Sequence, residues 1–515
     1  MDFLEGITPR DYQEKIFKTC LNKNCLVVLP TGLGKTLVAL MLTIERMKKF
    51  PGEKVLFLAP TKPLTEQHLN YFKKYLPELF GDMQLFTGII NAEKRKKIWK
   101  TADIIFSTPQ CIANDLKNNL YNLNEVCLLI EDEAHKCLKN YDYNYVAQQY
   151  KKQAENQRIV GLTASPGSEK SKIKEICKNL SIEEVELRTR DSDDVKKYLQ
   201  ELKFEKVMLN FPPEFEKIKI ALKKIFDDYV IELKSRKLLF GFASKTELIK
   251  LQKKIGFAIS QGKKNYNYLL GISTCAQAIK IQHALELLET QTLKSFEEYL
   301  ENLLEQAKKN QSKGVIKLVS KPEFNFAFKK SKEMLRKNIE HPKIKKIIEI
   351  ITEEKNTKSK VIIFTQFRDT ASLISKKINE IGKIKSKIFV GQTMKKGIGL
   401  KQKEQKKIIE EFSLGKIDVL VSTSIGEEGL DIPEVNTVIF YEPVASAIRT
   451  IQRGGRTARL MQGKIIMLIT KKTRDETYFY VAKAKEKKMH NVINSIKKDL
   501  ENNILLKNEE QIKLK

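Results

Sequence analysis

The sequence predicts an α/β protein with two parallel-sheet domains in tandem and a mostly helical insert domain between them. Its 515 residues exceed what one hydrophobic core organises. Short apolar runs alternate with helix-period segments near both ends of the chain, whereas the middle keeps helical periodicity alone. We therefore expect a first domain over residues 1–204, a helical insert over 205–335 and a second sheet domain over 336–515.

The first domain contains short apolar runs that are each followed by a polar turn and a helix-period segment. The strand candidates are residues 25–29, 55–59, 104–107, 126–130 and 159–163. Runs that are apolar throughout are typical of parallel strands covered on both faces. Ligands of such sheets gather at the carboxyl ends of the strands, so we expect site residues in the loops there.

The first of these loops has the pattern of a phosphate-binding loop. Residues 29–36 read Leu-Pro-Thr-Gly-Leu-Gly-Lys-Thr and lie between a strand and a helix, where loop N–H groups and the helix dipole converge on an anion. Lys35 would reach the β and γ phosphates, and the Thr36 hydroxyl would hold Mg²⁺. The general pattern has glycine where this chain has Leu29, and a bland loop with chance glycines is the alternative. The other residues of this loop that would contact the nucleotide are Pro30, Thr31, Gly32, Leu33 and Gly34.

Carboxylates follow the buried strand 126–130. The strand leads directly into Glu131, Asp132, Glu133, Ala134 and His135. Such carboxylates are costly to bury unless they hold a metal or a reacting water. We expect Asp132 to hold Mg²⁺ and Glu133 to orient and deprotonate the attacking water. A solvated acidic turn is the alternative, and the phosphate loop upstream argues against it.

With these two motifs the sequence resembles a DEAH-type superfamily 2 helicase, whose sheet domains are RecA-like. The resemblance implies that residues 10–13 read adenine, with Arg10 and Gln13 in contact with the nucleotide. It implies that residues 163–165, Thr-Ala-Ser, couple hydrolysis to movement. The implied nucleic-acid contacts of the first domain lie in the strand-end loops and are Thr61, Lys62 and Thr108. Phosphate contacts of this kind position a strand without reading its sequence.

The second domain restores the strand–helix alternation. Its strand candidates are residues 361–365, 388–390, 419–422, 438–441 and 465–469. Residues 422–433 and 452–459 match the remaining helicase motifs. Arg456 and Arg459 would share one side of a helix and act as arginine fingers on the γ phosphate, a role worth about 10³ to 10⁵ in rate. A surface salt-bridge role is the alternative. The further implied contacts are Gly426, Asp431 and Arg453 for the nucleotide, and Gln366 and Thr423 for nucleic acid.

The insert carries lysines on the polar faces of its helices. Lys253, Lys254, Lys263 and Lys264 lie near Tyr266 and Tyr268 in the sequence. Basic residues interleaved with aromatic ones can follow a phosphate backbone and stack on bases, although a solvated helical face is the usual fate of such a charge run. The insert and the overall layout resemble archaeal Hef and eukaryotic FANCM, in which a helical domain at this place is thought to engage branched DNA.

Composition agrees with a soluble, nucleic-acid-binding protein. The formal charge is +30, from 94 Lys and Arg against 64 Asp and Glu, and this surplus favours a polyanionic partner. The sequence has no apolar run of the length that a membrane span requires, and we expect a cytoplasmic protein. The seven cysteines are scattered without a C-x-x-C pair, which predicts reduced, buried thiols.

The residues and the resemblance together predict an ATP-dependent, Mg²⁺-requiring DNA helicase or translocase that acts on forked or branched DNA. Its partners would include repair or replication proteins. The nuclease signature E-R-K-x-x-x-D of Hef proteins is not present in this sequence, so we expect the helicase part alone. A double-stranded-RNA-directed ATPase of the Dicer or RIG-I-like type is one alternative, and an ATP-gated clamp that never separates strands is another.

Overall fold

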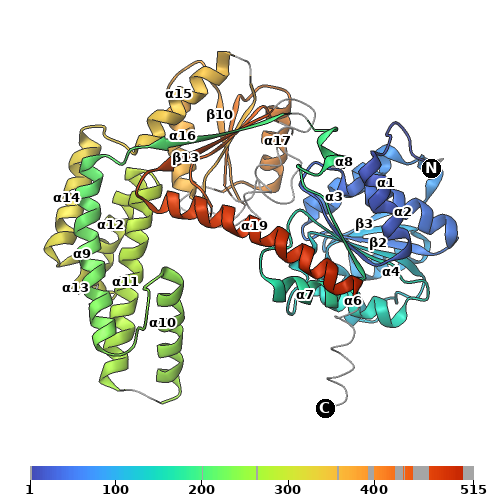
Figure 1. The fold of residues 1–515 in the computed structure, drawn as a ribbon, viewed down its shortest axis with the longest axis horizontal. Coiled ribbons are helices and arrows are strands. Elements are labelled where there is room, and N and C mark those ends of the chain that lie inside the picture. Colours follow the sequence, from blue (N-terminus) through green and yellow to red (C-terminus); the bar gives the residue numbers. More distant parts are fainter. Residues whose placement is uncertain are drawn as a thin grey trace.

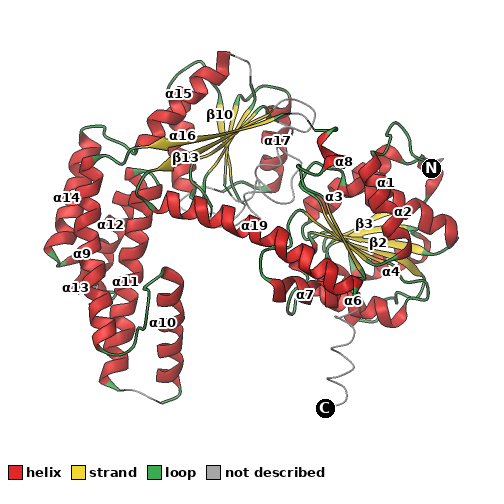
Figure 2. Ribbon diagram, viewed as in Figure 1, coloured by secondary structure: helices red, strands yellow, loops and turns green. Residues whose placement is uncertain are grey.

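The chain forms two parallel sheets and a helical bundle, as the sequence predicts (Figure 1). The structure is a computed structural model that describes residues 3–199, 201–262, 265–356, 359–391, 399–423, 433, 435–444 and 463–502. Each sheet is covered by helices on both faces (Figure 2). This arrangement confirms the predicted fold class, and the expected strand segments of both sheet domains are strands.

The first sheet has the strand order β3-β4-β2-β5-β6-β1-β7, and the paired strands run parallel. Strands β1, β2, β4, β5 and β6 are buried along their whole length, because helices cover both faces. Two clusters of apolar side chains fill the two faces. The strands are β1 (Cys25–Val28), β2 (Lys54–Leu58), β3 (Met83–Phe86), β4 (Ile104–Ser107), β5 (Val126–Asp132), β6 (Ile159–Thr163) and β7 (Glu184–Leu187).

Eight α-helices accompany this sheet among the described residues. They are α1 (Asp11–Asn22), α2 (Lys35–Lys49), α3 (Lys62–Tyr75), α4 (Ala92–Thr101), α5 (Pro109–Lys117), α6 (Asp142–Gln153), α7 (Lys170–Asn179) and α8 (Asp193–Lys196), with 3-10 turns η1 (Glu78–Phe80) and η2 (Ala134–Lys136). Helices α2, α3 and α5 each begin within a few residues of the end of a strand, so their N-termini lie at the carboxyl edge of the sheet.

The second sheet has the order β10-β11-β9-β12-β13-β8, again with parallel pairs. Its edge strand β8 (Leu202–Leu209) precedes the helical insert in the chain, whereas the other strands follow it. The other elements are β9 (Val361–Phe364), β10 (Ser386–Phe389), β11 (Val419–Ser422), β12 (Thr437–Phe440), β13 (Gly463–Thr470), α15 (Pro342–Asn356), α16 (Arg368–Asn379), α17 (Gln402–Ser413) and α19 (Arg474–Glu501).

The insert is a bundle with its own apolar core. Its long helices α9 and α11 pack on each other, and α10 packs on α11 at the side that faces the first sheet domain (Figure 1). The helices are α9 (Pro213–Ser235), α10 (Lys245–Ser260), α11 (Tyr266–Thr290), α12 (Leu293–Lys308), α13 (Lys313–Val319) and α14 (Pro322–Arg336). The predicted domain limits of 1–204, 205–335 and 336–515 stay a prediction.

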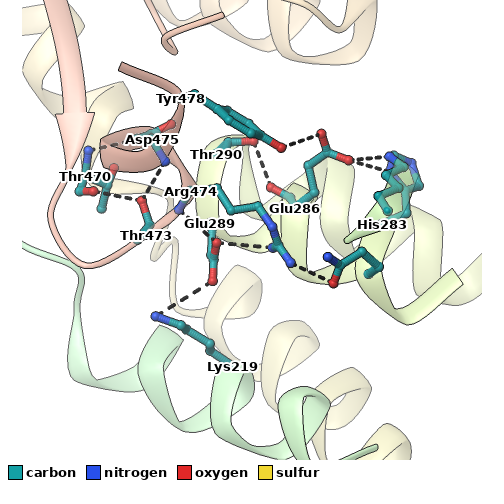
Figure 3. A network of polar contacts seen from close by, with 12 residues as sticks. Lys219, His283, Glu286, Glu289, Thr290, Thr470, Thr473, Arg474, Asp475 and Tyr478 are labelled. Atoms are coloured by element: carbon teal, nitrogen blue, oxygen red, sulfur yellow. Dashed lines mark hydrogen bonds and ion pairs between the residues drawn. The ribbon is translucent and has the colours of Figure 1, made fainter. Parts of the chain in front are cut away.

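Helix α19 connects all three parts of the molecule. It leaves β13, passes α11 of the insert and ends against β7 and α7 of the first sheet domain (Figure 1). At its start, Arg474 Nη1 lies 3.2 Å from Glu289 Oε2 on α11, and Asp475 accepts a hydrogen bond from the Thr470 N–H (Figure 3). At its far end, Met489, Ile493 and Ile496 enter the core of the first sheet domain.

Two chemical features of the described chain bear on the sequence predictions. All seven cysteines are buried free thiols, as predicted. Within the described part of the chain, none of the helices combines the length and apolar character that crossing a bilayer demands.

Candidate functional site

The phosphate-type loop joins β1 to α2 at the carboxyl edge of the first sheet. Gly32 and Gly34 have positive φ angles of 89° and 77°, which glycine adopts without strain. Gly34 is the N-cap of α2, so the free N–H groups of the first helical turn face the loop. Lys35 Nζ donates to the Leu29 carbonyl at 2.9 Å, which holds its charge inside the loop. This geometry suits an anion at the start of α2.

The candidate adenine element packs directly on this loop. Tyr12 Oη and Gln13 Nε2 both donate to the Leu33 carbonyl, at 2.9 and 3.1 Å. The φ of 77° favours glycine at position 34, and a Cβ there would push Gln13 Nε2 away from its bond to the loop. The Arg10 guanidinium lies 5.2 Å from the centre of the Tyr198 ring. The two elements that the sequence assigns to one nucleotide are therefore in contact.

The acidic motif lies two strands away at the same edge of the sheet. β5 extends through Asp132, and Glu133 has φ 54° and ψ 44°, a left-handed conformation that is unusual for a glutamate. His135 Nδ1 lies 3.1 Å from Glu133 Oε2 and 3.2 Å from Thr163 Oγ1 at the end of β6. His135 therefore connects the acidic motif to the Thr-Ala-Ser segment.

Asp132 has a partner that the sequence analysis missed. His68 Nε2 on α3 lies 2.8 Å from Asp132 Oδ2, and both side chains are buried. Burial alone would raise the pKa of Asp132, but the bond to His68 and the charge of Lys35 outweigh it and hold the pKa below its usual value. Asp132 is therefore a carboxylate at neutral pH. Only one signal in the sequence pointed to His68, its place on the apolar face of a helix beside Leu64, Leu69 and Phe72.

The donor set beside the loop fits Mg²⁺. Thr36 offers a hydroxyl oxygen and Asp132 an ionised carboxylate, and hard oxygen donors of this kind are what Mg²⁺ prefers. Thr36 and His68 line one cavity of about 480 Å³, which lies between α3 of the first sheet domain and α17 of the second. Lys406 on α17 bridges that gap with an ion pair of 2.9 Å to Glu66.

The expected backbone contacts occupy equivalent places in the two sheet domains. Thr61 follows β2 and Thr108 follows β4, and these strands are neighbours in the first sheet. Gln366 follows β9 and Thr423 follows β11, and these strands are neighbours in the second sheet. Both threonines of the first domain are N-caps, so each stands beside a helix N-terminus that can face a phosphate.

The remaining candidates are divided between exposed lysines and residues that the structure does not describe. Lys62 lies 3.4 Å from Glu66 on α3. Lys253 and Lys254 are exposed on α10. The residues outside the described ranges are Lys263, Lys264, Gly426, Asp431, Arg453, Arg456 and Arg459.

Comparisons with known proteins match successive segments of the chain to helicase domains. Residues 10–173 match the DEAD/DEAH box helicase model, residues 342–461 match the helicase conserved C-terminal domain, and residues 214–341 match a helical-bundle model named for an ATP-dependent RNA helicase. The crystal structure of the Pyrococcus furiosus Hef helicase domain superposes with a TM-score of 0.70 at 42% identity, over 92% of this chain and 98% of that one. The chain belongs to the Hef helicase family.

Curated relatives of this Hef-family chain are longer than it is. A Methanocaldococcus jannaschii protein named as an ATP-dependent RNA helicase is 40% identical over 95% of this chain and 61% of its own length. The Fanconi anemia group M protein homolog of Mus musculus is 32% identical over 91% of this chain, and the ATP-dependent DNA helicase mph1 of Sclerotinia sclerotiorum is 31% identical over 91%. The chain spans 25% of the mouse protein and 40% of the fungal one.

Proposed function

We propose that this Hef-family chain is an ATP-dependent DNA helicase or translocase that acts on forked or branched DNA in replication-fork repair. The observation that carries the proposal is that the Gln13 element contacts the Lys35 loop and the charge of Lys35 acts on Asp132 of the acidic motif at the same sheet edge, in a chain that shares the whole Hef helicase fold. The names of the mouse and fungal relatives support the DNA substrate and the repair setting.

In this proposal Lys35 and the loop bind the ATP phosphates, and Thr36 with Asp132 holds Mg²⁺. The metal supplies charge neutralisation for the phosphates when it is bound. Glu133 accepts the proton of the attacking water. His135, whose imidazole contacts both Glu133 and Thr163, would couple ATP hydrolysis to the Thr-Ala-Ser segment. Arg456 and Arg459, in the sequence of the second domain, would act as arginine fingers that neutralise charge on the γ phosphate. Closure of the two domains on ATP and reopening after hydrolysis would move the chain along a strand.

The strand-end residues are our candidates for the two backbone grips. Thr61, Lys62 and Thr108 would hold one stretch of backbone, and Gln366 with Thr423 would hold the next. The equivalent places of these residues on neighbouring strands of the two sheets support this assignment. Two matched grips on separate domains are what a stepping motor requires.

The outer face of α10 is our candidate for contact with the branched part of the substrate. Lys253 lies one helical turn from both Ile249 and Phe257, which are 38% and 68% exposed. Phe240 and Phe242, in the loop before α10, are 81% and 87% exposed. The exposed Phe257 ring one turn from Lys253 suits stacking on an unpaired base next to a phosphate backbone, and Phe240 and Phe242 add exposed rings to the same domain.

An RNA-directed ATPase is the second candidate, because the Methanocaldococcus relative and the helical-bundle model are both named for RNA helicases. ATP hydrolysis measured with single-stranded DNA, forked DNA and double-stranded RNA separates the two. We expect forked DNA to stimulate most, and preferential stimulation by double-stranded RNA would refute the DNA proposal. Vigorous hydrolysis without strand displacement on a fork would favour a clamp.

Two substitutions test the site assignment. Lys35→Ala should abolish hydrolysis, because the loop loses the cation that faces the β and γ phosphates. Glu133→Gln should bind ATP with little loss and fail to hydrolyse it, because the amide cannot accept the proton. A fluorescent ATP analogue reports binding, and released phosphate reports turnover. Substantial turnover by either variant would contradict the corresponding role.

A further inference from the structure

His68 lies outside the helicase motifs of the sequence yet touches the centre of the acidic motif. Its Nε2 is 2.8 Å from Asp132 Oδ2, a normal hydrogen-bond distance. The two side chains are only 6% and 7% exposed. Water therefore has little access to take over this hydrogen bond if the imidazole is removed.

The imidazole is fixed by its own surroundings. The rings of His68 and Phe57 lie 4.4 Å apart, centre to centre, and are tilted by 34°. The helix that carries His68 is anchored in the core by Leu69 and Phe72 on the same face. A ring held in this way presents Nε2 in one direction, so the Asp132 carboxylate has a preferred rotation about its Cβ–Cγ bond.

The location of His68 connects this contact to the proposed metal site. His68 and Thr36 line the same cavity of about 480 Å³, and the charge of Lys35 acts on Asp132. The carboxylate therefore lies between a fixed hydrogen-bond partner and the loop that would hold the phosphates. A group that orients a metal-binding carboxylate in this way changes metal affinity by about 10 to 100-fold.

We propose that His68 is a positioning residue that orients Asp132 for the metal of the bound nucleotide, and so sets the Mg²⁺ concentration that nucleotide binding requires. This inference rests on the proposed function, because it assumes that Asp132 serves Mg²⁺ and ATP. It predicts a specific defect: the loss of His68 weakens the response to Mg²⁺ and leaves the metal-independent contacts of the nucleotide intact.

The test compares His68→Met with His68→Gln. Both side chains fill much of the space of the ring, but only the glutamine amide can donate a hydrogen bond to the carboxylate. A fluorescent ATP analogue is titrated against the whole 515-residue chain with each substitution, first in EDTA and then at increasing Mg²⁺. We expect equal affinities in EDTA, a Mg²⁺ midpoint raised about 10 to 100-fold in His68→Met, and recovery of most of that shift in His68→Gln.

Asn70→Ala serves as the matched control, because Asn70 lies on the same helix, lines the same cavity and is exposed. Its Mg²⁺ midpoint should equal that of the wild type, and thermal melting reports whether each variant is folded. Equal Mg²⁺ midpoints in the wild type, His68→Met and His68→Gln would overturn the inference alone. Absence of any Mg²⁺ effect in the wild type would overturn the proposed function as well.

Discussion

Glu286 on α11 is a carboxylate whose partners come from three helices. Lys245 of α10 lies 2.5 Å from Oε2. His283 of α11 lies 3.3 Å from the same oxygen, and the Tyr478 hydroxyl of α19 donates to Oε1 at 3.3 Å (Figure 3). Burial alone would raise the pKa of Glu286, but the bonds to His283 and Lys245 outweigh it and lower the pKa to about 2. Glu286 therefore favours the folded state most when it is ionised.

The sign of the pH dependence follows from this lowered pKa. The stabilisation is complete above the pKa of about 4.3 that an unfolded glutamate has, and it is lost as the pH falls towards 2. We expect Glu286→Gln to lower the free energy of unfolding by about 3 kcal/mol at pH 7 and by about half of that at pH 3. Thermal midpoints of both proteins at the two pH values check this. If the thermal midpoints of wild type and Glu286→Gln differed by the same amount at pH 7 and at pH 3, the prediction would be wrong.

An exposed carboxylate of the same domain provides the control for Glu286. Glu247 lies 2.8 Å from Lys250 on α10, and the two side chains are 51% and 68% exposed. Solvent-exposed pairs contribute about 0 to 1 kcal/mol, so Glu247→Gln should leave the midpoint almost unchanged at both pH values.

The site residues that the sequence predicts are those whose roles are encoded locally. Lys35 and Thr36 belong to a strand–loop–helix pattern, and Asp132 and Glu133 directly follow a buried strand. His68 could not be found in this way, because its role depends on a contact with a residue 64 positions away. A histidine on an apolar helix face is usually a core residue, and the sequence does not say which side chain it meets.

The same limit separates the strands that the sequence predicts from those it misses. The central strands are continuous apolar runs, because both of their faces are covered. β3, β7 and β8 are edge strands of the two sheets and carry polar residues. In β7, for example, Glu184 pairs with Lys23 at 3.1 Å, and Thr19 donates to Glu186. Partners of this kind come from distant segments, so the local pattern does not indicate a strand.

The start of α19 is held by an ion pair that is completely buried. Lys343 of α15 lies 2.6 Å from Asp475 Oδ2, and both side chains are 0% exposed. Lys343 also donates to the Thr290 carbonyl at the end of α11. Burial outweighs the attraction of Lys343 and raises the pKa of Asp475, so the partner is needed to keep this carboxylate charged.

Removal of one partner of this pair should cost far more than removal of both. Lys343→Met leaves an uncompensated buried carboxylate, and we expect a loss of about 3 to 5 kcal/mol. The double variant Lys343→Met with Asp475→Leu should recover most of that loss, because neither charge then needs solvation. Thermal midpoints of the wild type, both single variants and the double variant give a double-mutant cycle, which measures the interaction between the two charges. Additive losses would show that the two charges do not interact.

Helix α19 makes the core of the first sheet domain depend on the far end of the chain. Met489, Ile493 and Ile496 are at most 2% exposed there, and Asp499 lies 3.1 Å from both Lys170 and Lys174 of α7. The Ser165 hydroxyl donates to Met489 Sδ at 2.9 Å. The helix that leaves the second sheet domain therefore touches the Thr-Ala-Ser segment beside His135.

A helix fixed at both ends should restrict the relative motion of the two sheet domains. Ile493→Asp would bury a charge without a partner and should release the far end of α19. Asn494→Asp adds the same charge at an exposed position of the same helix and serves as the control.

Spin labels on cysteines introduced at Lys96 of α4 and Lys407 of α17, both exposed, report the distance between the domains, since all seven native thiols are buried. We expect a broadened distance distribution and a lowered thermal midpoint for Ile493→Asp, and wild-type values for Asn494→Asp. A narrow, unchanged distribution in Ile493→Asp would mean that contacts such as Glu66–Lys406 hold the domains without α19.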